Sequence, residues 1–69
     1  MKNNFAEVLK SLRIDNNLSQ TGLSQAVGIS QSIIARWEKG ERVPTLDNLI
    51  TLSKYFGCTI DYLAGLEQD

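Results

Sequence analysis

The sequence predicts an all-α fold of five short helices, and three observations lead to that prediction. Apolar residues recur at steps of three and four, the spacing of a helix that buries one face. No stretch alternates apolar and polar residues over the length of a strand. Proline is confined to Pro44, so no earlier helix is interrupted. The 69 residues, 42% of them hydrophobic, suffice for one domain over residues 1–69.

The first helix is expected over residues 4–15, and the second from its cap at Ser19 to Val27. The apolar stripe of the first helix consists of Phe5, Val8, Leu9 and Leu12. In the second helix Leu23 and Val27 form the buried pair. Gly22 weakens this helix by about 1 kcal/mol relative to alanine.

A tight turn separates the second helix from the third. Gly28 follows the second helix as a residue able to take positive φ. Ser30 caps the third helix, which runs to Lys39 and stops at Gly40. Residues 20–40 therefore predict a pair of helices joined by a turn.

The last two helices follow an extended connector over residues 41–44, because a residue before proline avoids the α region. Thr45 caps the fourth helix, which ends at Gly57, and Thr59 caps a short fifth helix, which ends at Gly65. The fourth helix carries a broad apolar arc of Leu46, Leu49, Ile50, Leu52 and Phe56. Such an arc is typical of the central helix of a bundle.

The third helix separates into two faces when each residue advances it by about 100°. The face expected to anchor in a core consists of Ile33, Ile34, Trp37 and Glu38. The opposite face consists of Gln31, Ser32, Ala35, Arg36 and Lys39. On DNA, Gln pairs with adenine, Arg with guanine and Ser with several bases, and Ala contacts the thymine methyl group. The absence of acids from this face favours base reading over an ordinary solvated helix surface, which is the alternative.

An ion pair is predicted between the first and third helices. Glu38 lies at the edge of the apolar face, where a half-buried carboxylate needs a partner. Arg13 lies likewise at the edge of the stripe on the first helix. Pairing of the two would clamp these helices together; the alternative is that both reach solvent independently.

Charge is divided unevenly along the chain, whose net charge is −1 and whose pI is about 5.2. Residues 1–44 hold six Lys and Arg against four Asp and Glu, a net of +2. Residues 45–69 hold one against four, a net of −3. The positive excess therefore accompanies the helix pair, which weakens the argument that an acidic chain makes against nucleic-acid binding.

Composition excludes several classes of function. Cys58 is the only cysteine and histidine is absent, so neither an internal disulfide nor a Cys/His metal cluster can form. We therefore expect no metal and no cofactor, and with no Gly-rich phosphate loop either, no enzyme. No apolar run approaches the ~18 residues of a membrane span, and the N-terminus lacks the features of a secretory signal. The expected location is the cytoplasm, with no membrane partner.

The helix pair and its flanks match a known pattern. The matching residues are Gln20, Leu23-Ser24, Gly28, Ser30, Trp37-Glu38-Lys39-Gly40, Pro44 and the ending Ile60-Asp61-Tyr62-Leu63-Ala64-Gly65. With these residues the chain resembles, from Phe5 to Gly65, the Cro/phage-repressor-like (XRE-type) helix-turn-helix family of bacterial and phage DNA-binding domains. The Arg13–Glu38 pair is similar to the buried ion pair usual in that family. Gly22 and Ser24 depart from the pattern, where a long polar residue and an alanine are usual.

The resemblance implies a five-helix lambda-repressor-like fold whose third helix enters the major groove of double-stranded DNA. The residues expected to read bases are Gln31, Ser32, Ile33, Ala35 and Arg36. Those expected to contact the DNA backbone are Gln20, Thr21, Ser30, Lys39 and Arg42. The family binds inverted-repeat operators as homodimers, with half-sites ~34 Å apart. Candidates for an apolar dimer surface are Ile14, Tyr55, Tyr62 and Leu66, with isolated surface residues as the alternative.

The leading hypothesis is a sequence-specific transcriptional regulator, of the phage, prophage or mobile-element repressor type, acting at the nucleoid. Close alternatives are a restriction–modification controller protein and the antitoxin of a toxin–antitoxin pair. A protein partner, such as a toxin or an anti-repressor, stays open. A different class is a protein-interaction module without DNA binding, which the slight acidity favours and the acid-free face opposes.

Overall fold

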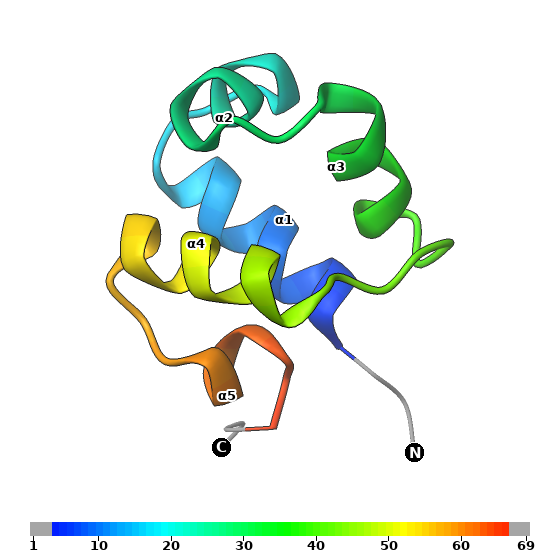
Figure 1. Ribbon diagram of the computed structural model, residues 1–69. Helices are drawn as coiled ribbons and strands as arrows, with labels where there is room; N and C mark the ends of the chain where they lie inside the picture. The colour runs from blue at the N-terminus through cyan, green and yellow to red at the C-terminus, as the bar shows by residue number, and fades with distance from the viewer. Residues whose placement is uncertain (1–3, 67–69) are drawn as a thin grey trace.

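The computed structural model describes residues 4–66, and within that range the chain forms five helices and no strand (Figure 1). The helices are α1 (Phe5–Asp15), α2 (Gln20–Val27), α3 (Gln31–Glu38), α4 (Leu46–Phe56) and α5 (Ile60–Leu63). The predicted all-α, five-helix fold is confirmed. Residues 1–3 and 67–69 of the expected domain lie outside the described residues.

Hydroxyl side chains set the start of every helix after the first. The capping residues are Ser19, Ser30, Thr45 and Thr59. Each side-chain oxygen accepts a hydrogen bond from the backbone N–H three residues later, over 2.9–3.2 Å. Such a cap contributes ~1 kcal/mol and satisfies a donor that the helix itself cannot pair. All four caps lie where the sequence predicts them.

Left-handed residues end the first two helices. Asn17 has a φ of 59°, and α1 stops two residues earlier at Asp15. Gly28 has a φ of 74° and turns the chain from α2 toward α3. This conformation is costly for residues that carry a Cβ atom, which explains the glycine at the turn. The third helix ends at Glu38, one residue earlier than expected, with Lys39 as its C-cap.

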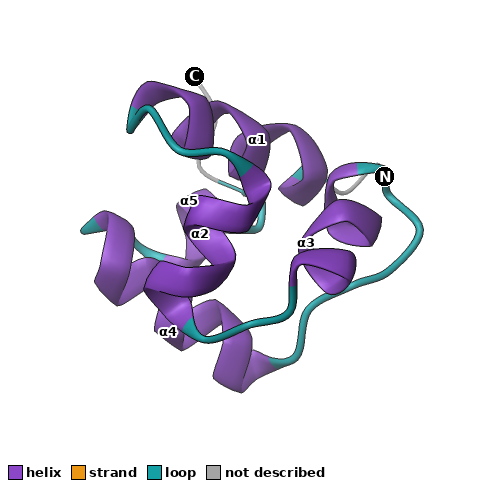
Figure 2. Ribbon diagram, turned by 90° about the horizontal axis from the view of Figure 1, so that it is seen from above, coloured by secondary structure: helices purple, strands orange, loops and turns teal. Residues whose placement is uncertain are grey.

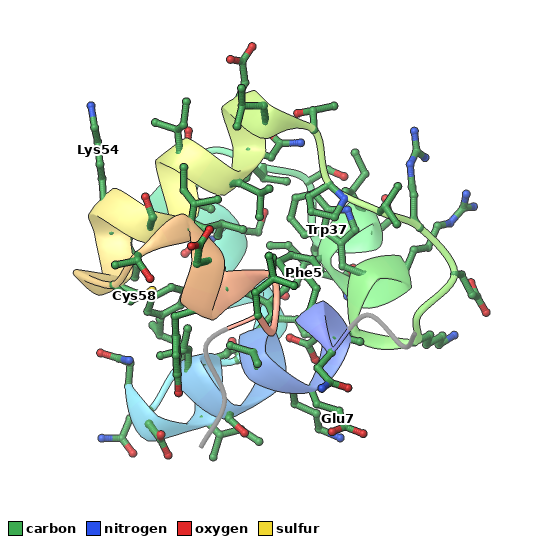
Figure 3. The ribbon with its side chains drawn as sticks, turned by 90° about the horizontal axis from the view of Figure 1, so that it is seen from below. Phe5, Glu7, Trp37, Lys54 and Cys58 are labelled. Atoms are coloured by element: carbon green, nitrogen blue, oxygen red, sulfur yellow. The ribbon has the colours of Figure 1, made fainter. Side chains whose placement is uncertain are left out.

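The five helices share one hydrophobic core. α3 packs against both α1 and α2, while α5 packs against α1 and α4, and α2 against α4. The buried side chains are Phe5, Val8, Leu9, Leu23, Ile34, Trp37, Leu52 and Leu63. Figure 3 shows Phe5 beside Trp37, and their rings meet edge to face with centroids 5.7 Å apart. The first and third helices are thus joined by aromatic packing.

The apolar arc of α4 is narrower than the sequence predicts. Leu52 is fully buried, and Leu49 and Phe56 pack partly against the core. These three residues follow steps of three and four, so they share one stripe. Leu46 lies about 90° from the centre of that stripe, in the first turn of the helix, and is 64% exposed. The expectation that Leu46 belongs to the buried arc is therefore wrong.

Candidate nucleic-acid interface

The second and third helices lie next to each other and are joined by residues 28–30, as Figures 1 and 2 show. Leu23 of α2 and Ile34 of α3 are both fully buried in the common core. Because both helices are anchored by their inner faces, the orientation of their outer faces is fixed relative to the rest of the fold.

The exposed face of α3 carries polar and basic side chains. Among the five residues expected to read bases, Gln31, Ser32 and Arg36 are exposed, whereas Ala35 is half-buried. Ile33 is also half-buried, because it packs partly against the core. The face that points outward is therefore formed chiefly by hydrogen-bonding groups.

Arg13 and Glu38 lie together in the structure, with bidentate geometry. Arg13 Nε donates to Glu38 Oε2 over 2.7 Å, and Arg13 Nη2 donates to Glu38 Oε1 over 2.9 Å. Arg13 Nη1 donates to the carbonyl oxygen of Leu18 over 2.9 Å. The side chains are only 12% and 5% exposed, so this contact joins α1 to α3 largely out of water.

The pKa of Arg13 is raised above its ordinary value, first by the hydrogen bond to Glu38 and then by the charge of that carboxylate, while burial acts in the opposite direction. A cation with a raised pKa adds stability below its unfolded pKa and loses it only as pH rises through the folded value. Because an arginine side chain ordinarily loses its proton only far above neutral pH, and the pKa of Arg13 is raised further, Arg13 stays charged throughout the neutral range.

Two glutamines extend this ion pair toward the exposed face. Gln20 Nε2 donates to Glu38 Oε1 over 3.0 Å. Gln31 Nε2 donates to Gln20 Oε1 over 2.8 Å. A continuous set of hydrogen bonds thus leads from Arg13 to the first residue of α3. We define it as the Arg13–Gln31 chain; it consists of Arg13, Glu38, Gln20 and Gln31.

Sequence reasoning does not find this chain, because it treats Gln20 and Gln31 as independent. One signal points to it: each glutamine is the first residue of its helix, directly after a serine cap. Two short helices joined by a tight turn bring such positions close together. Gln20 is half-buried, and its amide oxygen and nitrogen are both engaged within the protein, which leaves one N–H for a phosphate.

The other residues expected to contact the DNA backbone are on the surface. Thr21, Ser30, Lys39 and Arg42 are all exposed. Ser30 Oγ accepts from the N–H of Ile33 and lies 3.2 Å from Ser32 Oγ. Its first role in the structure is therefore that of a helix cap.

The distribution of charge on this side favours an anionic partner. Arg36, Lys39 and Arg42 are exposed, against the exposed carboxylate of Glu41. The one acid of α3, Glu38, turns inward and is neutralised by Arg13. Folding thus removes the only negative charge of α3 from the surface.

Other features of the described residues do not compete with this face as a site. A surface hollow of about 120 Å³ is lined by Phe5, Val43, Pro44, Leu49 and Ala64. None of these residues belongs to α2 or α3, and pockets for small molecules are usually ~300–1,000 Å³. Over residues 4–66 no set of three or more His, Cys, Asp or Glu side chains is placed to hold a metal ion. In the same part of the chain every helix is too short or too polar to cross a bilayer.

Comparison with known proteins identifies the class to which this arrangement belongs. A helix-turn-helix family profile matches residues 9–63. The chain is 38% identical over 64 residues to the HTH-type transcriptional activator BcrR of Enterococcus faecalis, covering 93% of this chain and 31% of that protein. It is 37% identical over 59 residues to the repressor protein C2 of Salmonella phage P22, covering 86% of this chain and 27% of that protein. It therefore spans about a third or less of both relatives.

A solved structure gives the same assignment for the fold. A transcriptional regulator from Listeria innocua superposes with a TM-score of 0.87 at 29% identity, covering the whole of this chain and 64% of that one. The fold and the paired helices define a helix-turn-helix protein with the lambda-repressor-like arrangement. The chain belongs to the Cro/C1-type helix-turn-helix family, to which the match over residues 9–63 assigns it.

Proposed function

We propose that this protein binds double-stranded DNA sequence-specifically and regulates transcription, with α3 lying in the major groove. The observation that carries the proposal is the construction of α3. Its single acid is paired inward with Arg13, while Gln31, Ser32 and Arg36 are exposed. A helix held in this way presents hydrogen-bonding groups and positive charge to a groove floor without a repelling carboxylate.

The roles follow from the chemistry of each side chain. Gln31, Ser32 and Arg36 read base edges, with Ala35 and the outward part of Ile33 as apolar contacts. Lys39 and Arg42 contact phosphates and set the register of the helix on the duplex. Thr21, Ser30 and the remaining N–H of Gln20 add backbone contacts near the start of each helix.

A single small domain makes few contacts with DNA, so binding as a dimer raises the affinity. We propose a homodimer on an inverted repeat, as helix-turn-helix proteins use half-sites ~34 Å apart. Ile14, Tyr55, Tyr62 and Leu66 are 39–68% exposed and are the candidates for the dimer surface. A regulator of the phage or mobile-element repressor type, acting at the nucleoid in the cytoplasm, is the form that the similarity to the phage repressor supports.

The first test is fluorescence anisotropy with a labelled random-sequence duplex over a range of salt. Phosphate contacts release counterions, so binding should weaken linearly on a plot of log K against log salt. Absence of binding even at low salt would defeat the proposal and favour a protein-interaction module. Gln31→Ala then separates base reading from charge: it should weaken the cognate site and leave random DNA unaffected.

A further inference from the structure

The residue that ends α5 packs directly against the residue that begins α1. Gly65 has a φ of 79°, and a Cβ atom at this position would lie 2.7 Å from Asn4 Cβ and 3.1 Å from Asn4 Cα and N. Carbon atoms in contact are normally about 3.5–4.0 Å apart. The atoms of Asn4 belong to its backbone or adjoin it, so they cannot turn aside. Gly65 must therefore be glycine for this contact as well as for its backbone conformation.

The other glycines with positive φ make no such contact. They have φ values of 70–76° and are Gly28, Gly40 and Gly57. No atom lies within 4 Å of a Cβ placed on any of these three. Gly65 is also held in place by a hydrogen bond, because its N–H donates to the carbonyl oxygen of Tyr62 over 3.0 Å. The end of α5 thus fixes where α1 begins.

α1 contacts α3 near both of its ends. Phe5, the first residue of α1, meets the ring of Trp37 edge to face with centroids 5.7 Å apart (Figure 3). Arg13, near the other end, pairs with Glu38. At about 1.5 Å per residue these two contacts lie about 12 Å apart along α1. Since their partners are neighbours in α3, a tilt of α1 turns the C-terminal part of α3.

The ring of Phe5 has open space on one side. It lines the surface hollow of about 120 Å³ together with Ala64, whereas Trp37 does not line it. Trp37 is 1% exposed and is held by the core. The ring of Phe5 therefore has room to shift toward the hollow and away from Trp37 unless the start of α1 is held in place. The contact between Gly65 and Asn4 provides that restraint.

The part of α3 that α1 holds carries cations of the proposed DNA interface. Arg36 and Lys39 lie on either side of the two residues that contact α1, and both are exposed. We propose that Gly65 is a positioning residue for DNA recognition: by packing against Asn4 it fixes the start of α1, and α1 fixes the direction in which α3 presents Arg36. This inference rests on the proposed function.

The test compares Gly65→Ala with Gly57→Ala. Each places a Cβ atom on a residue with positive φ after a helix, but only the first meets another part of the fold. Affinity for the selected DNA site is measured by anisotropy at a temperature where circular dichroism shows both variants folded. The affinity of Gly65→Ala should fall about fivefold, and that of Gly57→Ala should stay close to the wild-type value. Equal affinities of the two folded variants would overturn the inference.

Fluorescence gives a second readout, because Trp37 is the only tryptophan of the chain. The emission of the folded protein without DNA should change in Gly65→Ala and not in Gly57→Ala, since only the first alters the contact with Phe5. A loss of stability alone leaves the emission of the folded state as it is. An emission that is the same in both variants would therefore overturn the positioning role.

A compensating substitution tests the contact itself. Asn4→Gly removes the Cβ atom that lies nearest to the new one in Gly65→Ala, whereas Asn4→Ala keeps it. Combined with Gly65→Ala, Asn4→Gly should restore part of the lost affinity and Asn4→Ala should restore none. Equal effects of the two substitutions at Asn4 would contradict the proposed contact.

A further pair of variants decides the matter if Gly65→Ala does not fold. Phe5→Leu removes the ring that contacts Trp37 and should lower the affinity about fivefold. Phe56→Leu is the control, because Phe56 packs on the core from α4 and its ring meets Tyr55. Equal affinities would again overturn the inference. A wild type that binds no DNA would instead defeat the proposed function.

Discussion

The region of α2 and α3 and the region of α4 and α5 begin their helices in the same way but use their polar side chains differently. In the first region, side chains bond from one helix to another, as Gln31 does to Gln20 and Gln20 to Glu38. In α4, by contrast, Thr51 and Ser53 bond back to carbonyl oxygens of their own helix.

The two surfaces differ in the same sense. The first region exposes Arg36, Lys39 and Arg42. The second exposes large apolar side chains, namely Leu46, Tyr55, Tyr62 and Leu66. A polar network is needed where side chains must be aimed, while a helix that only supports the core needs one buried stripe. This difference supports the proposal that the region of α2 and α3 contacts DNA.

The largest effect should come from the core that both regions share. Leu23 of α2 and Leu52 of α4 are each fully buried. Replacing either by alanine removes packed atoms and leaves a cavity, which should lower the free energy of unfolding by about 2–5 kcal/mol. Urea denaturation measures both variants. If one variant loses less than about 1 kcal/mol of unfolding free energy, the helix that carries the residue does not belong to the common core.

The next largest effect should come from the ion pair between Arg13 and Glu38. Arg13→Met or Glu38→Gln alone leaves one group of a largely buried pair without its partner, and each should cost about 3 kcal/mol. The double variant should cost clearly less than the sum of the two. A double-mutant cycle on unfolding free energies gives the coupling, expected to be about 1 kcal/mol or more. Strict additivity would mean that the contact does not stabilise the fold.

Replacing one exposed cation on each surface tests whether the surface of α3 or that of α4 contributes to DNA binding. Arg36→Ala should cost ~1–3 kcal/mol of binding free energy on the selected site and relax specificity at one position. Lys54→Ala is the matched control, because Lys54 points away from the fold on α4 in Figure 3 and lies outside the proposed interface. Anisotropy titrations measure both. Equal losses would show that total charge, and not the face of α3, determines binding.

A smaller, uniform effect is expected at Lys39. Lys39→Ala removes one phosphate contact, so cognate and random duplexes should weaken alike and the salt slope should fall by about 1. The slope of log K against log salt is the readout for both duplexes. A loss confined to the cognate site would move Lys39 to the base-reading group.

The smallest effect is expected at Leu46. Because its side chain is 64% exposed, Leu46→Ser should change the unfolding free energy of the folded chain by no more than about 0.5 kcal/mol. Thermal or urea unfolding against Leu52→Ala gives the contrast within one helix. A loss comparable with that of Leu52→Ala would restore Leu46 to the buried arc.

Local chemistry explains which parts of the fold the sequence predicts. Caps such as Ser19 and Thr45, and stops such as Gly28, depend on neighbouring residues, so they can be read from the chain. The burial of Leu46 depends on which helices cover α4, and periodicity alone overestimates it. Caps and stops are thus set by neighbouring residues, whereas the burial of a side chain is set by the packing of distant parts of the chain.

The candidate site divides in the same way. The placement of Arg13 and Glu38 follows from two helical wheels, because each lies at the edge of an apolar face. The link through Gln20 does not, because it requires the relative position of α2 and α3. The sequence therefore predicts the exposed residues of α3, and only the structure shows how one of them is oriented.

The most direct test of the central claim is selection from a randomised duplex pool, with sequencing of the bound DNA, for wild type and Arg36→Ala. The account predicts an enriched inverted repeat for the wild type, and the loss of preference at a single position of each half-site for the variant. An unchanged motif in the variant, or no enrichment by the wild type at low salt, would contradict the claim that the exposed face of α3 reads bases.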